Sequence, residues 1–251
     1  MKTKEVLALL DDVMQPGRIK DYCPNGLQVE GTGTITKVVT GVTASEAMID
    51  AAIAANADML LVHHGYFWKG ESPIVKGMKR RRLAKLLAND INLVAYHLPL
   101  DVHPEHGNNA QLGKLLGVEQ IESLEPENPG SVVVRGVLNQ PLTAEQLGRL
   151  IEAKLGRKPL INAVRDELIH TVAWCTGGGQ GFIDAAADAG IDAFLSGEVS
   201  EQTIHSSREQ QIDFFACGHH ATERYGAMAL GQYLAEKTGL DVQFIDIDNP
   251  A

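Results

Sequence analysis

Residues 38–65 read VVTGVTASEAMIDAAIAANADMLLVHHG, and this stretch decides the fold. An apolar run at each end encloses a segment with apolar residues at helical intervals, which predicts a strand, a helix over residues 44–55 and a second strand. Thr43 and Glu46 have the spacing of a capping box, which predicts where this helix starts. Two strands joined through a helix enter a sheet in the same direction, so the stretch predicts a parallel βαβ unit.

The same pattern occurs again over residues 172–199, VAWCTGGGQGFIDAAADAGIDAFLSGEV, which align with residues 38–65 without gaps and share the helical core Ile-Asp-Ala-Ala. The chain is therefore predicted to be an α/β protein of two related units with mainly parallel sheets. Glu, Pro, Asn and Gly crowd residues 122–130, which favours a boundary there. The predicted units are residues 1–126 and 127–251, with the option that the last strand returns to the first unit.

Other elements follow from the same periodicities. Apolar runs predict further strands at residues 91–95, 132–138, 212–216 and 242–247. Helical spacing predicts helices at residues 4–14, 80–88, 109–116, 144–155 and 221–236. Pro99 argues against a helix in the turn that follows the strand at residues 91–95.

Composition restricts the class of protein. The chain has 251 residues, of which 44% are hydrophobic and 22% charged, a balance typical of a globular protein with a full core. A net charge of −10 disfavours a broad nucleic-acid surface. No run of about 18 apolar residues occurs, and the start turns acidic early, so we expect neither a membrane span nor a secretion signal. Cys23, Cys175 and Cys217 are widely spaced, which favours reduced thiols in the cytoplasm.

His63 and His64 follow the apolar run of residues 59–62 and precede Gly65. They are therefore expected at the C-terminal end of a buried parallel strand, the edge at which open α/β sheets bind ligands. Adjacent residues on a regular strand point to opposite faces, so both imidazoles converge only if the strand breaks there. The alternative is one hydrogen-bonded core histidine and one exposed histidine.

Two further strand ends carry a histidine and an acid four residues apart. His97 and Asp101 follow the strand at residues 91–95, and His219 and Glu223 follow the strand at residues 212–216. Residues four apart in the opening turn of a helix share one face, so His219 and Glu223 could bind the same ion. Each pair alone is a common chance occurrence, but three such features at three strand ends favour a metal site.

Histidine and carboxylate ligands without thiolates suit Zn, Mn, Fe, Co or Ni. The candidate ligands number five, which exceeds the need of one tetrahedral ion, and they are His63, His64, Asp101, His219 and Glu223. A bridging carboxylate could hold a second ion about 3.5 to 4 Å from the first. Glu223 is the candidate bridge, and the predicted dinuclear site lies in the cleft between the two units.

The chain resembles the GTP cyclohydrolase I type 2 family, also called the Nif-three-like proteins, in its short bacterial form. The segments that carry the resemblance span nearly the whole chain, and they are Pro24-Asn25-Gly26-Leu27-Gln28, Val62-His63-His64-Gly65, His97-Leu98-Pro99-Leu100-Asp101, Leu195-Ser196-Gly197-Glu198 and Gly218-His219-His220-Ala221-Thr222-Glu223. The resemblance implies two divalent metal ions at the five candidate ligands and a ring-shaped homohexamer with its centres facing an internal cavity. The family name also implies ring opening of GTP.

Other residues have an open role. His97 is a candidate catalytic residue, either as a proton carrier or as a group that orients a ligand, and the alternative is a packed loop histidine. Glu198, near His205, belongs to an accessory polar site or to a helix start. The aromatic run at residues 66–68 stacks on a purine ring or packs in the core. The basic run at residues 79–82 steers phosphates or forms a solvated helix face.

The sequence thus supports a metal-dependent hydrolase that acts on a nucleotide or related heterocycle, with the ions activating water. The alternative is a hexameric scaffold or protein-interaction module without catalysis, in which the ions are structural. A role in nucleic-acid binding ranks third, because the net charge opposes it.

Overall fold

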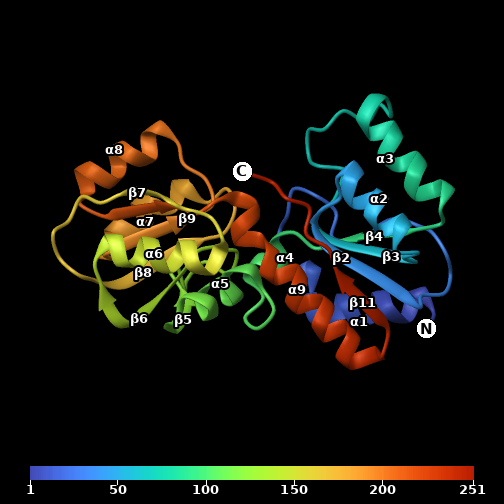
Figure 1. Ribbon diagram of the computed structural model, residues 1–251, viewed down its shortest axis with the longest axis horizontal. Helices are drawn as coiled ribbons and strands as arrows, with labels where there is room; N and C mark the ends of the chain where they lie inside the picture. The colour runs from blue at the N-terminus through green and yellow to red at the C-terminus, as the bar shows by residue number, and fades with distance from the viewer. The chain divides into compact units, whose positions relative to one another are not determined.

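The computed structural model describes residues 1–251, and the chain divides into two compact units. The first unit consists of Met1–Gly107 and Gly226–Asp248, and the second of Asn108–Tyr225 and Asn249–Ala251. Each unit has a sheet of its own with helices on it (Figure 1). The predicted α/β class with two units is confirmed. None of the helices combines the length and the apolar character needed to cross a membrane.

The boundary between the units lies after Gly107 and differs from the predicted one after residue 126. The Pro- and Gly-rich stretch near residue 126 is the loop between β5 (Val118–Ser123) and β6 (Val134–Leu142), which pair antiparallel inside the second unit. Turn residues occur there because the chain reverses between two paired strands. The last strand, β11 (Asp241–Phe244), does return to the first sheet, where it pairs with β2 (Lys37–Thr43).

The first sheet has the strand order β1-β4-β3-β2-β11. Its remaining strands are β1 (Gly26–Val29), β3 (Met59–His64) and β4 (Asn92–Ala95). All neighbours pair in parallel except β1 and β4, so the predicted parallel βαβ unit is present as β2, α2 and β3. The helices of this unit are α1 (Thr3–Met14), a short 3-10 turn (Pro16–Arg18), α2 (Glu46–Ala54), α3 (Gly77–Ala88), α4 (Leu98–Val102) and α9 (His219–Thr238) from Gly226 onward.

Helices cover both faces of the first sheet (Figure 1). Alternate strand residues point to opposite faces. Leu60 of β3 packs with residues of α2 and α3 on one face, and its neighbours Met59 and Leu61 pack with α1 and α9 on the other. The strands are therefore apolar on both sides, as buried parallel strands are.

The second sheet has the strand order β5-β6-β8-β9-β10-β7. Its remaining strands are β7 (Leu160–Asn162), β8 (Ile169–Cys175), β9 (Ala193–Ser196) and β10 (Asp213–Ala216). Parallel pairing is confined to β8, β9 and β10, and the other neighbours are antiparallel. The prediction of mainly parallel sheets therefore holds for the first sheet and for the centre of the second, where the repeated βαβ pattern lies.

Helices also cover both faces of the second sheet. They are α5 (Asn108–Leu116), α6 (Ala144–Leu155), a 3-10 turn (Gln180–Phe182), α7 (Ile183–Asp188), α8 (Glu201–Gln210) and the start of α9. Trp174 and Leu195 pack with α5 and α6, whereas Phe194 and Phe214 pack with α7. The two units thus share a three-layer arrangement.

Two local predictions are wrong. The cap of α2 is Ser45, whose hydroxyl accepts a hydrogen bond from the backbone N–H of Met48 at 3.2 Å, while Thr43 still belongs to β2. A short helix, α4, does form at Pro99. Proline is tolerated there because it lies in the first turn, where a backbone N–H has no partner within the helix.

Candidate metal centre

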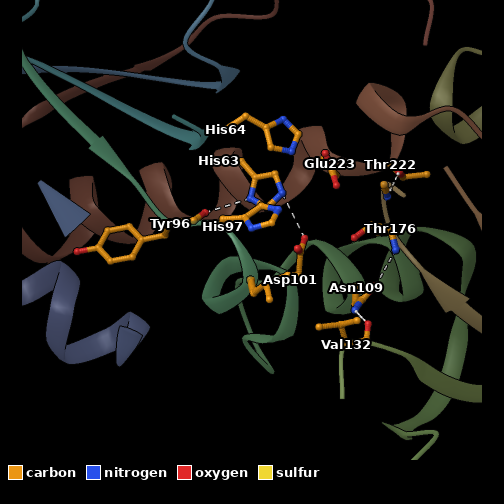
Figure 2. A network of polar contacts seen from close by, with 12 residues as sticks. His63, His64, Tyr96, His97, Asp101, Asn109, Val132, Thr176, Thr222 and Glu223 are labelled. Atoms are coloured by element: carbon orange, nitrogen blue, oxygen red, sulfur yellow. Dashed lines mark hydrogen bonds and ion pairs between the residues drawn. The ribbon is translucent and has the colours of Figure 1, made fainter. Parts of the chain in front are cut away.

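His63 and His64 are the last two residues of β3, and their ring centroids lie 4.4 Å apart. His64 is still paired with Thr43 of β2, and Gly65 follows directly. The strand therefore ends directly after the histidine pair, at Gly65, where the sequence indicated a break. Both rings lie together at the C-terminal edge of the parallel strands (Figure 2).

His63 is buried with its two ring nitrogens in different surroundings. Its Nδ1 lies 3.0 Å from the backbone oxygen of Tyr96, which can only accept a hydrogen bond, so Nδ1 carries the proton. The other nitrogen, Nε2, faces Oδ1 of Asp101 at 3.4 Å (Figure 2). Asp101 belongs to α4 and is itself buried. A backbone carbonyl on Nδ1 is the usual way in which a protein orients a metal-binding imidazole.

Two more imidazoles of the first unit are held in the same manner. Nδ1 of His64 lies 3.0 Å from the hydroxyl oxygen of Thr43, and Nδ1 of His97 lies 2.8 Å from Oδ1 of Asp21. His63, His64 and His97 each offer a ring nitrogen, and these three nitrogens lie within 4.8 Å of one another. We call these three residues the histidine cluster.

Residues 24–28 support the turns that carry the histidine cluster. The side-chain oxygen of Asn25 accepts a hydrogen bond from the backbone N–H of His97 at 2.7 Å. The side-chain oxygen of Gln28 accepts one from the backbone N–H of Tyr66, two residues after His64, also at 2.7 Å. Residues 24–28, one of the segments that carry the family resemblance, therefore hold the backbone of two turns that are distant from each other in the sequence.

In the second unit, His219 and Glu223 lie in the first turns of α9 on one face, as their spacing predicted. Nε2 of His219 lies 3.2 Å from Oε2 of Glu223, and its Nδ1 lies 2.7 Å from Oε1 of Glu198. Glu198 follows β9 and is not a helix start, because α8 begins at Glu201. Of the two readings left open for Glu198, the accessory polar role therefore fits the structure.

Gly177 makes room for His219 and Glu223. Its φ is +63°, and a Cβ at this position would overlap Oε1 of Glu223 and lie 2.9 Å from Nε2 of His219. The hydroxyl of Thr222 accepts a hydrogen bond from the backbone N–H of Gly177 at 3.0 Å. The side chain of Asn109 accepts one from the N–H of the preceding residue at 3.1 Å (Figure 2). The loop is thus fixed against α9.

The electrostatics of His219 lead to a pH-dependent stability. Burial disfavours its charged form, but hydrogen bonds and charges from Glu223 and Glu198 outweigh burial and raise the pKa of His219 from 6.5 to about 9. The pKa of His219 is thus higher in the folded than in the unfolded protein. Its interactions therefore contribute stability that is fully present below about pH 6.5 and is lost as the pH rises to about 9.

We expect the free energy of unfolding of the metal-free protein to fall by on the order of 1–2 kcal/mol across this window, a value reduced for partial solvent exposure. Urea unfolding at a series of pH values, in the presence of a chelator, measures the slope. His219→Asn should remove it. An equal slope in both proteins would show that His219 does not carry the effect.

Two of the four residues in the basic run at residues 79–82 pair with acids. Lys79 pairs with Glu71 at 3.2 Å, and Arg81 pairs with Glu46 at 3.1 Å. The structure therefore favours the solvated helix face over a site that steers phosphates.

The aromatic run divides between core and site. Tyr66 is buried, and its hydroxyl donates to the backbone oxygen of Ala44 at 2.6 Å, so it serves packing. The Trp68 ring meets the His97 ring edge-on, with centroids 4.9 Å apart. The three cysteines are buried and form no disulfide.

The predicted ligands therefore occur as two sets, one in each unit. The first unit brings together His63, His64 and Asp101, with His97 beside them, and the second unit brings together His219 and Glu223. The sequence did not single out Asp21 or Gly177. The available signals were a glycine in the loop after β8 and an acid before the Asn-Gly-Leu-Gln segment. Neither residue belongs to a helical or strand periodicity, so no sequence pattern pointed to it.

Two sets of imidazoles and carboxylates at strand ends of a two-unit α/β protein define a class of candidate metal-binding proteins. The family model described as Duf34/NIF3 (NGG1p interacting factor 3) matches residues 1–250, and the chain belongs to this family. A protein of Escherichia coli (strain K12), called GTP cyclohydrolase 1 type 2 homolog, is 58% identical over 252 residues that cover 100% of both chains.

Solved structures show the same fold. One, described as protein ybgI of unknown function, is 57% identical with a TM-score of 0.96 and covers 100% of both chains. Another, the protein TTHA1606 from Thermus thermophilus, is 32% identical with a TM-score of 0.90, again over 100% of both chains.

Proposed function

We propose that this protein is a metal-dependent hydrolase with a dinuclear centre. The proposed ligands are His63, His64 and Asp101 from the first unit and His219 and Glu223 from the second, with Glu223 as the bridge. Bound divalent ions would lower the pKa of water and polarise the substrate, which is the chemistry that such centres supply.

The observation that carries the proposal is the way in which the imidazoles are held. His63 and His64 have Nδ1 against a carbonyl or hydroxyl oxygen, and His219 has Nδ1 against a carboxylate. In each case the partner on Nδ1 fixes the orientation of the ring and leaves Nε2 as the nitrogen for the proposed ion. A hydrogen bond on the far nitrogen is characteristic of metal-binding histidines, because it sets the tautomer and raises the basicity of the ligating nitrogen.

The donor set also limits the metal. Imidazole nitrogens and carboxylate oxygens fit Zn, Mn, Fe, Co or Ni, whereas an all-oxygen calcium site or a thiolate zinc site would need other residues. In the metal-free protein, the raised pKa of His219 means that a proton must leave this ring before an ion binds to it.

The proposed substrate is a nucleotide or a related heterocycle. This assignment follows the names of relatives such as the Escherichia coli GTP cyclohydrolase 1 type 2 homolog. Within the first unit, the Trp68 ring lies beside His97, with ring centroids 4.9 Å apart, so an aromatic side chain borders the histidine cluster. We further propose that the protein works in the cytoplasm as a toroidal homohexamer, and that nucleic acid is not a partner because of its net charge of −10.

A second candidate function is a metal-containing hexameric scaffold or interaction module. The family description, NGG1p interacting factor 3, supports it, because it refers to interaction and not to a reaction. In this case the ions would hold the assembly together without turning over a substrate.

A substrate screen with purified protein separates the two candidates. Elemental analysis of protein purified without added metal identifies the ion, and the metal-loaded protein is then tested on panels of nucleotides, phosphoesters and cyclic amides, with His63→Ala as the blank. Turnover by the wild type alone supports the hydrolase. Tight metal binding without turnover of any panel member contradicts it, and dissociation of the hexamer in Glu223→Ala would favour the scaffold.

A further inference from the structure

Asp21 and His97 form a buried pair in the first unit, although 76 positions separate them. The side chain of Asp21 is only 3% exposed and that of His97 only 11%. Oδ1 of Asp21 accepts from Nδ1 of His97 at 2.8 Å, and Oδ2 accepts from the backbone N–H of Leu98 at 2.9 Å and from the amide of Asn25 at 3.0 Å. The carboxylate of Asp21 therefore accepts hydrogen bonds both from the ring of His97 and from the backbone next to it.

Asp21 is held in its charged form. Burial opposes the charge, but hydrogen bonds from His97, Asn25 and Leu98 outweigh it and hold the pKa of Asp21 well below its ordinary value. An ionised carboxylate only accepts hydrogen bonds, so Nδ1 of His97 must carry a proton. In the neutral ring, Nε2 then carries a lone pair.

The partner of His97 distinguishes it from the other two members of the histidine cluster. At Nδ1, His63 faces a neutral carbonyl and His64 a hydroxyl. Only His97 has a carboxylate on Nδ1, which holds the ring in one orientation with Nδ1 protonated, whereas His63 meets the carboxylate of Asp101 at Nε2. Its ring centroid lies 5.1 Å from that of His63 and 5.7 Å from that of His64.

A metal site made of Asp21, Cys23 and His97 is the competing interpretation, since their ligand atoms lie within 4.8 Å of one another. Burial and the neighbouring Asp21 raise the pKa of the Cys23 thiol to about 12, and the thiol lies 3.9 Å from Oδ1 of Asp21, to which it donates. The oxygens of Asp21 already accept several hydrogen bonds. The geometry is that of a carboxylate that positions a histidine.

We propose that Asp21 is a positioning residue that fixes His97 in the Nδ1–H tautomer, so that Nε2 is the proton acceptor beside the ligands His63 and His64. The proposal rests on the hydrolase function proposed above. When a water molecule attacks the substrate, its oxygen bonds to the electrophilic atom, and the bond from that atom to the leaving group breaks, its electron pair going to the leaving group. The O–H bond of the water breaks, Nε2 of His97 takes the proton, and the imidazolium formed is paired with the carboxylate of Asp21.

The tautomer can be measured without turnover and without metal. Two-bond ¹H–¹⁵N NMR spectra of the metal-free protein, recorded where the ring is neutral and assigned with His97→Gln, should show a proton on Nδ1 of His97 and none on Nε2. Asp21→Asn replaces one carboxylate oxygen with an NH2 group, which donates hydrogen bonds and cannot accept them. This group must face a donor that now meets an oxygen, and we expect Nδ1 of His97 to become the acceptor and the ring proton to move to Nε2. Asp21→Ser, which cannot reach the ring, should also lose the Nδ1–H preference.

Asp58→Asn is the matched control, because Asp58 also accepts hydrogen bonds from backbone N–H groups of the first unit, at Thr36 and Lys37. It should leave the His97 tautomer unchanged. Metal content should be the same in Asp21→Asn as in the wild type, while turnover of bis(4-nitrophenyl) phosphate by the loaded protein should fall at least tenfold in kcat with little change in KM.

Three results would overturn the proposal. A proton on Nε2 in the wild type would exclude the acceptor geometry. An unchanged tautomer in both Asp21 variants would show that Asp21 does not set it. Metal loss in Asp21→Asn equal to that in His63→Ala would make His97 a ligand and not an acceptor. A wild type without turnover counts against the hydrolase function alone, because the NMR result stands by itself.

Discussion

Replacing Gly177 with alanine is expected to abolish metal binding by His219 and Glu223 while the second unit stays folded. A methyl group there would overlap Oε1 of Glu223 and lie 2.9 Å from Nε2 of His219, so both side chains must move. The positive φ of +63° adds backbone strain of about 1–3 kcal/mol. Metal titration followed by calorimetry, with circular dichroism to check the fold, measures both effects.

Gly190→Ala is the control for the strain. Gly190 belongs to the same unit and has a φ of +70°, but nothing lies within 4 Å of a Cβ at this position. It should lose similar stability and keep its affinity for metal. Equal metal affinities in the two variants would show that the space at Gly177 does not determine the ligand geometry.

Replacing Trp174 with alanine should give the largest loss of stability in the second unit, about 3–5 kcal/mol. Trp174 is 2% exposed and belongs to the core formed with α5 and α6. Gly113 of α5 packs closely on it, since a Cβ there would lie 2.7 Å from Cζ2 of the indole. The indole N–H also donates to the backbone oxygen of Asn109 at 3.0 Å, so the substitution leaves that oxygen without its donor.

Urea unfolding followed by circular dichroism measures this loss, and Trp174→Phe provides the comparison. Phenylalanine keeps most of the packing but lacks the N–H, so we expect a smaller loss. The only other tryptophan of the chain, Trp68, belongs to the first unit and reports its unfolding by fluorescence in the alanine variant. A loss below about 1 kcal/mol would contradict the assignment of Trp174 to a closely packed core.

Much of the fold could be predicted because it depends on local periodicity. The repeated strand-helix-strand pattern marks β2, α2 and β3 in one unit and β8, α7 and β9 in the other, and continuous apolar runs mark the strands of both. The spacing of His219 and Glu223 likewise predicted one face of a helix, because α9 begins at His219.

The failures concern features that depend on distant parts of the chain. The boundary after Gly107 was missed because the loop between β5 and β6 has the same turn-forming composition as a linker. Ser45 and Thr43 are both suitable caps, and only the pairing of Thr43 with His64 in the sheet decides between them. Asp21 meets His97 through the tertiary fold alone, and no spacing in the sequence indicates that contact.

The measurement that tests the central proposal most directly is the number of metal ions per chain in the wild type, His63→Ala, Glu223→Ala and the double variant. These substitutions remove one ligand from each unit. If the two units share one dinuclear centre, the wild type holds about two ions, each single variant falls below one, and the double variant is no lower than the single ones. If each single variant keeps one ion and only the double variant loses both, the units bind metal separately and the shared centre is wrong.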